Sequence, residues 1–90
     1  MAGPLHPGRR PLRSLFPDFY DRALRRLVRA RKAAGVTQAT LAETLGRPQS
    51  FIAKYEGGER RIDVAEFVTI ARAIGVDPYR MLRAAEKGTD

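Results

Sequence analysis

The sequence contains no cysteine, and its only histidine, His6, lies in a stretch rich in proline and glycine. Without cysteine, neither disulfide bonds nor thiolate metal sites can form. A lone histidine in such a stretch is a poor candidate for a transition-metal ligand, so we expect no metal and no cofactor. The lack of cysteine is also consistent with the reducing cytoplasm, which is where we expect this protein to reside.

Long apolar runs are missing as well. No run approaches the roughly 20 residues that a membrane-spanning helix needs, and no continuous apolar stretch follows the basic residues near the N-terminus. The patterns of common catalytic sites are absent too, because there is no Cys/His pair and no glycine-rich phosphate loop after a strand. We therefore expect no membrane segment, no secretory signal and no enzyme.

Positive charge is what the sequence has in excess. The 90 residues include 17 Lys and Arg against 10 Asp and Glu, which gives a net charge of +7. This excess is typical of proteins that bind nucleic acid or an anionic membrane surface, although a basic protein with no such partner would have the same composition. Membrane binding would need the apolar side of residues 20–34, which we assign to the core instead.

The charge is concentrated towards the N-terminus. Residues 1–17 carry three arginines and no acid, and residues 18–34 carry six basic and two acidic residues. Residues 35–62 have four basic and three acidic residues, and residues 63–90 have four and five. The C-terminal third is therefore the least basic part of the chain.

Residues 1–17 also contain four prolines and two glycines. Proline disrupts regular helices, so we predict a flexible basic arm over this range. Its arginines are Arg9, Arg10 and Arg13. Two roles remain open for the arm. It follows a nucleic-acid backbone or enters a minor groove, or it is only a disordered basic leader.

The rest of the chain shows the periodicity of amphipathic helices, with no strand pattern and no internal repeat. We predict helices from near Asp18 to residue 34, and over residues 38–45, 49–56, 64–74 and 78–86. Their boundaries are set by N-cap residues and by terminal glycines: Thr37, Asp63 and Asp77, and Gly35, Gly46 and Gly75. Residues 18–86 thus form one all-α domain, followed by a frayed tail over residues 87–90.

The apolar side of each helix predicts the core. The residues expected to face inward are Tyr20, Ala23, Leu24, Leu27, Val28, Leu41, Ala42, Leu45, Ile52, Tyr55, Val64, Phe67, Val68, Ala71, Ile74, Tyr79, and Met81 or Leu82.

Residues 37–56 have the pattern of two short helices joined by a tight turn. Helices that cross steeply over such a turn need a small residue where they meet, and Ala42 supplies it. Gly46 permits the turn, because a left-handed backbone is readily accessible to glycine. Ile52 and Tyr55 would anchor the second helix in the core. The pattern predicts a helix-turn-helix, with an ordinary helical hairpin as the alternative.

Three segments carry a family pattern: Arg31-x-x-x-Gly35, Thr37-Gln38-x-x-Leu41-Ala42-x-x-Leu45-Gly46 and Ile52-x-x-Tyr55-Glu56-x-Gly58. With these segments, residues 24–83 resemble the Cro/repressor-like (Xre-type) helix-turn-helix domain. The resemblance departs from the family at Pro48, Gly57 and Glu59, where serine or threonine, asparagine and lysine are common. It implies an all-α, five-helix lambda-repressor-like bundle and a bacterial, sequence-specific DNA-binding transcriptional regulator such as a repressor.

The resemblance also implies which residues contact double-stranded DNA. The base-reading residues would be Gln49, Ser50 and Lys54, on the exposed side of the helix over residues 49–56. The phosphate contacts would be Thr37, Gln38, Arg47, Arg60 and Arg61. An ion pair between Arg31 and Glu56 would tether the base-reading helix to the scaffold. Phe51 either packs at the edge of the core, which we favour, or touches a thymine methyl group.

Two further expectations concern partners. A single domain of this size contacts few bases, so we expect a homodimer on DNA, with the two C-terminal helices as candidates for its interface. The alternative is an antitoxin-type module that keeps the same fold but mainly binds a protein such as a toxin.

Overall fold

The computed structural model of the chain describes residues 16–88. These residues form five α-helices. These are α1 (Phe16–Ala33), α2 (Gln38–Leu45), α3 (Gln49–Glu56), α4 (Val64–Ile74) and α5 (Pro78–Lys87). The all-α, five-helix prediction is confirmed, and the described residues contain no strand. The predicted arm, with Arg9, Arg10 and Arg13, falls outside the described residues except for its last two positions.

The helix boundaries agree closely with the prediction. The limits of α2, α3 and α4 are those expected, whereas α1 begins at Phe16, two residues earlier than predicted, and α5 ends at Lys87 rather than residue 86. The early start of α1 is compatible with Pro17, because proline is tolerated in the first turn of a helix.

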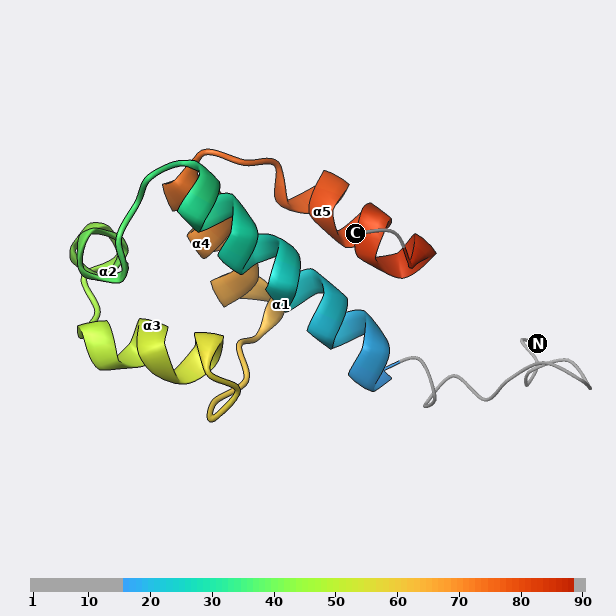
Figure 1. Ribbon diagram of the computed structural model, residues 1–90, viewed down its shortest axis with the longest axis horizontal. Coiled ribbons are helices and arrows are strands. Elements are labelled where there is room, and N and C mark those ends of the chain that lie inside the picture. Colours follow the sequence, from blue (N-terminus) through green and yellow to red (C-terminus); the bar gives the residue numbers. More distant parts are fainter. Residues whose placement is uncertain (1–15, 89–90) are drawn as a thin grey trace, which may run out of the picture.

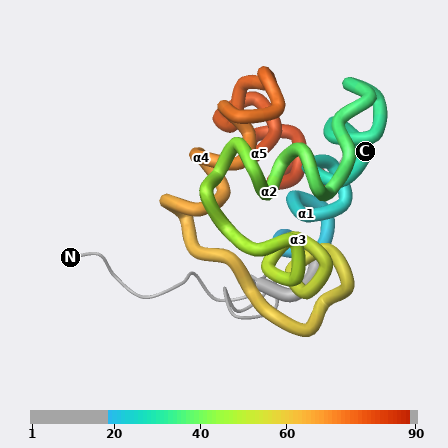
Figure 2. Tube along the Cα trace, turned by 90° about the vertical axis from the view of Figure 1, so that its left-hand side faces the viewer, coloured from blue at the N-terminus to red at the C-terminus, as the bar shows by residue number. Residues whose placement is uncertain are grey.

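The five helices place the helix-turn-helix on one side of the molecule. In both Figure 1 and Figure 2, α3 and α5 lie on opposite sides, with α1 and α4 between them. The long helix α1 packs mainly against α5, and α2 packs against α3 and α4. None of the five described helices combines the length and apolar character that a bilayer crossing requires.

The core lies where the five helices meet. The large side chains that are fully buried there include Leu27, Leu41, Ile52, Tyr55 and Ile70. Burying apolar area of this kind is the main favourable contribution to folding.

The predicted core was wrong at two positions. Val64 is 76% exposed and Tyr79 is 52% exposed, although both were expected to face inward. Along α4 the buried stripe is Phe67, Ile70, Ala71 and Ile74. This stripe is rotated about the helix axis relative to the predicted one, because Ile70 is buried whereas the predicted Val68 is only half-buried.

The predicted caps are present. The Thr37 side chain accepts a hydrogen bond from the Thr40 N–H at 3.0 Å, and the Asp77 carboxylate accepts from the first turn of α5. At α4, Asp63 and Glu66 form a capping box in which each side chain accepts the backbone N–H of the other. Gly46 ends α2 with a φ of 67°, the left-handed conformation that the tight turn was expected to need.

Candidate nucleic-acid interface

The third helix has one anchored side and one open side. Phe51, Ile52 and Tyr55 are buried and fix α3 on the bundle, and the Phe51 and Tyr55 rings meet edge to face at 5.3 Å between centroids. Packing of Phe51 at the edge of the core is therefore confirmed, since only 7% of it is exposed. The open side is made by exposed residues: Gln49, Ser50, Ala53 and Lys54. The three predicted base-reading residues thus lie together on an uncovered surface.

The end of α3 is held by a buried ion pair. The Arg31 guanidinium donates to both carboxylate oxygens of Glu56, with Nε–Oε2 and Nη2–Oε1 distances of 2.7 and 2.9 Å. Arg31 also donates to the carbonyl oxygen of Val36 at 2.7 Å. The hydrogen bond to Glu56 raises the pKa of Arg31 above its ordinary value, which keeps the guanidinium charged. Sequence-distant helices α1 and α3 are thereby joined.

The start of α2 joins the same network. The side-chain amide of Gln38 donates to Glu56 Oε1 at 3.0 Å. The Thr37 hydroxyl is engaged in capping α2 and donates to the Thr40 hydroxyl at 3.0 Å. Both of these predicted phosphate contacts therefore make hydrogen bonds within the chain, and Gln38 is half-buried.

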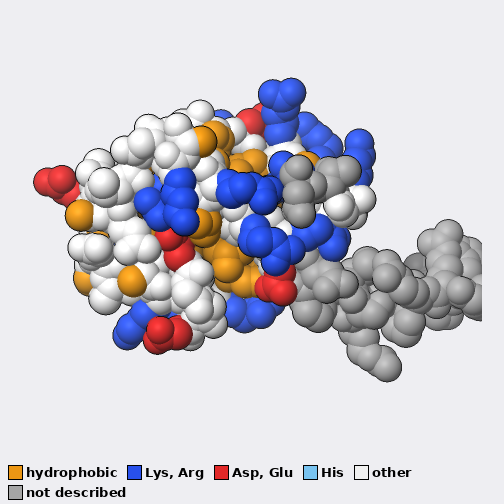
Figure 3. Space-filling model, in the orientation of Figure 1, with side chains coloured by type: hydrophobic (Ala, Val, Ile, Leu, Met, Phe, Trp, Pro, Cys, Tyr) orange, Lys and Arg blue, Asp and Glu red, His pale blue; other side chains and the backbone are white. Residues whose placement is uncertain are grey.

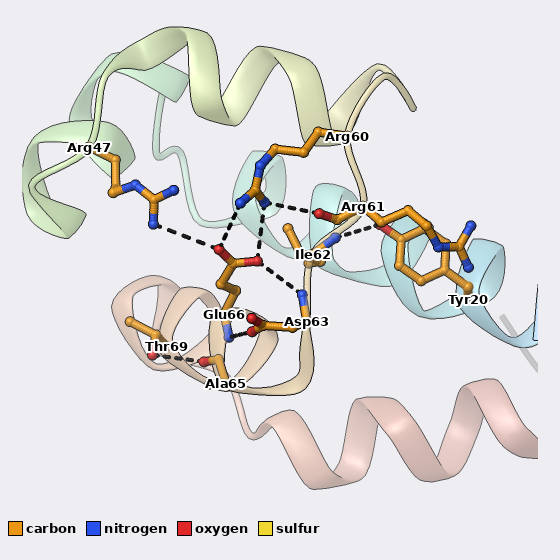
Figure 4. Close-up of polar contacts among 9 residues, drawn as sticks. All are labelled: Tyr20, Arg47, Arg60, Arg61, Ile62, Asp63, Ala65, Glu66 and Thr69. Carbon is orange, nitrogen blue, oxygen red and sulfur yellow. Dashed lines mark hydrogen bonds and ion pairs between the residues drawn. The ribbon is translucent and has the colours of Figure 1, made fainter.

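Two other predicted phosphate contacts, Arg47 and Arg60, come together beside α3 (Figure 4). Their guanidinium carbons lie 3.9 and 4.8 Å from the centroid of the Phe51 ring, within the range of a cation–π contact. Both arginines also reach Glu66 on α4. Arg60 donates to the two carboxylate oxygens at 3.1 and 3.2 Å, and Arg47 Nη1 lies 3.8 Å from Oε2.

Within this cluster, Arg60 and Glu66 stabilise each other's charged forms. The hydrogen bond from Arg60, followed by the one from the backbone of Asp63, lowers the pKa of Glu66 below its ordinary value. In turn, the hydrogen bond to Glu66 raises the pKa of Arg60. Glu66 was not among the residues predicted for the site. The spacing Asp63-x-x-Glu66 could have revealed its capping role, but nothing in the sequence indicates that it binds the two arginines.

The carbonyl oxygen of Arg61 accepts a hydrogen bond from Arg60 Nη1 at 2.9 Å, but its side chain points away from that cluster. Its guanidinium carbon is 4.0 Å from the centroid of the Tyr20 ring on α1, and the Tyr20 hydroxyl accepts a hydrogen bond from the Ile62 N–H at 3.2 Å. These contacts, visible in Figure 4, fasten the loop that follows α3 to the first half of α1. The Arg61 side chain therefore lies beyond Arg60, towards α1 rather than over Phe51.

The face of the molecule drawn in Figure 3 is mixed in character. Lys and Arg side chains gather across its middle, with apolar surface between them and a few acidic side chains nearby. A cavity of about 180 Å³ opens beside the cluster and is lined in part by Arg47, Phe51 and Glu66. Within residues 16–88, no three acidic or histidine side chains converge in a way that would hold a metal ion.

The short helix α3 follows a tight turn, is anchored on one side and presents polar side chains on its other side. This arrangement is that of a helix-turn-helix domain. The helix-turn-helix family model HTH_3 matches residues 27–80. The solved structure of an XRE-family like protein from Pseudomonas syringae pv. tomato str. DC3000 is 47% identical in sequence, with a TM-score of 0.80. That match covers 88% of this chain and 96% of the other. A comparison with curated proteins found no significant match.

The chain belongs to the Cro/C1-type (XRE) helix-turn-helix family. Domains of this family typically bind DNA and are generally not enzymes.

Proposed function

We propose that the chain is a sequence-specific DNA-binding transcriptional regulator that reads the major groove with α3. The observation that carries this proposal is the open side of α3, where Gln49, Ser50 and Lys54 are exposed on a helix whose other side is buried. An α-helix is about 10–12 Å wide and fits a major groove about 12 Å wide. A glutamine side chain can bind adenine through two hydrogen bonds, and a lysine can reach guanine or a phosphate.

The residues around α3 are candidates for contacts to DNA phosphates. Arg47 and Arg60 flank α3 on the side of α4. Thr37 and Gln38 lie at the N-terminus of α2, where the helix dipole favours an anion. We assign Arg61, beside Tyr20, to a further backbone contact. Bound in this way, the protein would act sterically, as a repressor does, in the bacterial cytoplasm where the chromosome lies.

We also propose that two copies bind together. An eight-residue α3 reaches few base pairs, and a symmetric dimer would read two half-sites about 34 Å apart. We assign the interface to α4 and α5, because residues 63–90 are the least basic part of the chain and would be repelled least by a second copy.

Selection of bound sequences from a random duplex pool tests the proposal. We expect an enriched sequence with two-fold symmetry, bound more tightly than random duplex at about 100 mM salt. Affinity should fall steeply as salt is added, because each phosphate contact releases about 0.9 counterion. If no sequence is enriched over random duplex, the regulator function is wrong and the antitoxin-type protein-interaction module becomes the better hypothesis.

A further inference from the structure

The cluster beside α3 brings two guanidinium groups to one carboxylate. Arg47 comes from the turn before α3, Arg60 from the loop after it, and Glu66 from the first turn of α4 (Figure 4). The ring of Phe51, which belongs to α3 itself, supports both arginines at 3.9 and 4.8 Å. The position of both positive groups is thus set by the same helix that we assign to base reading.

A carboxylate and a phosphate are similar ligands for a guanidinium group. Both offer two oxygens that accept parallel hydrogen bonds from its planar fork. Arg60 binds Glu66 in this way, through Nη1 and Nη2 at 3.1 and 3.2 Å. The carboxylate therefore occupies the place that a phosphate oxygen pair would take.

The cluster is also accessible. About 40% of each arginine side chain is exposed, namely 41% for Arg47 and 40% for Arg60, and the cavity of about 180 Å³ lies next to Glu66. An anion can reach both guanidinium groups without unfolding any helix. The 3.8 Å distance from Arg47 to Glu66 is longer than the two bonds from Arg60, so Arg47 is the more weakly held of the two.

We propose that Arg47 and Arg60 form a binding site for one DNA phosphate, and that Glu66 occupies this site in the free protein as an internal competitor. The proposal rests on the DNA-binding function proposed above. It means that DNA must exchange one carboxylate for one phosphate at this position. Glu66 thereby weakens the contribution of these two arginines to binding of any duplex.

The test compares the variants Glu66→Gln and Glu59→Gln. Glutamine at position 66 keeps the acceptor that the capping box needs but removes the negative charge. Glu59 is an exposed carboxylate next to Arg60 in sequence, so its variant changes the net charge equally without touching the cluster. Melting curves within about 4 °C of the wild type establish that both variants are folded.

We expect Glu66→Gln to bind a random-sequence duplex about three- to five-fold more tightly at about 100 mM salt, with a smaller change for Glu59→Gln. The slope of log K against log salt should stay unchanged, because both proteins bind the same phosphate and differ only in the carboxylate that must be displaced. In an Arg60→Gln background, the same substitution at Glu66 should gain no more than Glu59→Gln does, because the two hydrogen bonds that hold Glu66 in the site are absent. Equal effects of the two single variants, or weaker binding by Glu66→Gln, would overturn the proposal.

A titration with inorganic phosphate separates this proposal from the wider function, because it needs no DNA. The Arg60 Nε–H signal in a ¹⁵N spectrum should shift with phosphate in Glu66→Gln and much less in the wild type. A shift of the same size in both proteins would mean that Glu66 does not compete. If the duplex selection enriches nothing while the phosphate result holds, the anion site stands and the regulator function fails.

Discussion

Arg31 at the end of α1 and Glu56 at the end of α3 are joined by two parallel hydrogen bonds, and each side chain is only 9% exposed. The pair connects the last turn of α1 to the end of α3, the helix proposed to read DNA. A charge is buried at such a place only when it is paired and hydrogen-bonded. The orientation of α3 thus depends on a polar contact as well as on its apolar anchors.

Replacement of Arg31 by alanine should destabilise the domain by about 3 kcal/mol, because the substitution leaves the Glu56 carboxylate buried without its cation. Urea unfolding measures the loss, and DNA affinity should fall with it. Arg25→Ala, at an exposed position of the same helix, should leave stability within about 0.5 kcal/mol of the wild type. An Arg31→Ala protein with wild-type stability but no DNA affinity would show that Arg31 contacts DNA directly.

Gly46→Ala should destabilise the domain by about 1–2 kcal/mol, since the φ of 67° is unfavourable for a residue with a Cβ atom. No heavy atom of the surrounding structure lies within 4 Å of a Cβ built there, so the cost comes from the backbone alone. Thermal unfolding should show a decrease of about 4–8 °C for each kcal/mol. Gly46→Asn should be milder, because asparagine tolerates this conformation; equal losses for both variants would contradict the explanation.

Gln49→Ala should relax base preference at one position of the selected sequence. The expected loss of discrimination is about 1–3 kcal/mol, the value of one good side-chain–base pair. Because Gln49 is exposed, the melting temperature should stay unchanged. The measurement is a repeat of the duplex selection with the variant, and an unaltered selected sequence would remove Gln49 from the base-reading set.

Lys54→Gln should weaken binding and, if Lys54 contacts a phosphate, reduce the salt slope by about 0.9. The matched control is Lys87→Gln on α5, which removes the same charge from an exposed position on the opposite side of the molecule (Figure 1). Fluorescence anisotropy at several salt concentrations measures both variants. Equal effects at the two positions would mean that only net charge matters.

Acid should destabilise the wild type more than Glu66→Gln. The pKa of Glu66 is lowered in the folded protein, so as pH falls below the ordinary carboxyl value of about 4.3, the unfolded chain takes up the proton first. The stability that the ionised Glu66 contributes above that pH is therefore lost progressively as the pH falls towards the lower pKa of the folded state. Between about pH 5 and pH 3 we expect the melting temperature of the wild type to fall by a few degrees more than that of the variant. Glu59→Gln should follow the wild type.

The sequence predicted most of the fold because its local signals agree with one another. Thr37, Asp63 and Gly46 each mark a helix end, and the structure places a boundary at each of them. The errors at Val64 and Tyr79 arose where an apolar residue stands at the start of a helix. Periodicity defines a stripe but not its rotation, which is decided by the neighbouring helices.

The site was less predictable than the fold. The open side of α3 follows from the helical positions of Ile52 and Tyr55, which leave Ser50 and Lys54 outside. The contact of Arg47 and Arg60 with Glu66 could not be predicted, because it joins a turn, a loop and a helix that meet only in the folded chain. Long arginine side chains reach several alternative partners, and sequence spacing does not select among them.

With only eight residues, α3 is shorter than the roughly 12–15 residues that an isolated helix needs to persist in water. A synthetic peptide copied from residues 49–56 would therefore lose the helical shape and could not substitute for the domain. Conversely, the outward-facing positions contribute little to stability and are open to redesign. Exchanging Gln49, Ser50, Ala53 and Lys54 for those of a relative should transplant its target preference onto this scaffold.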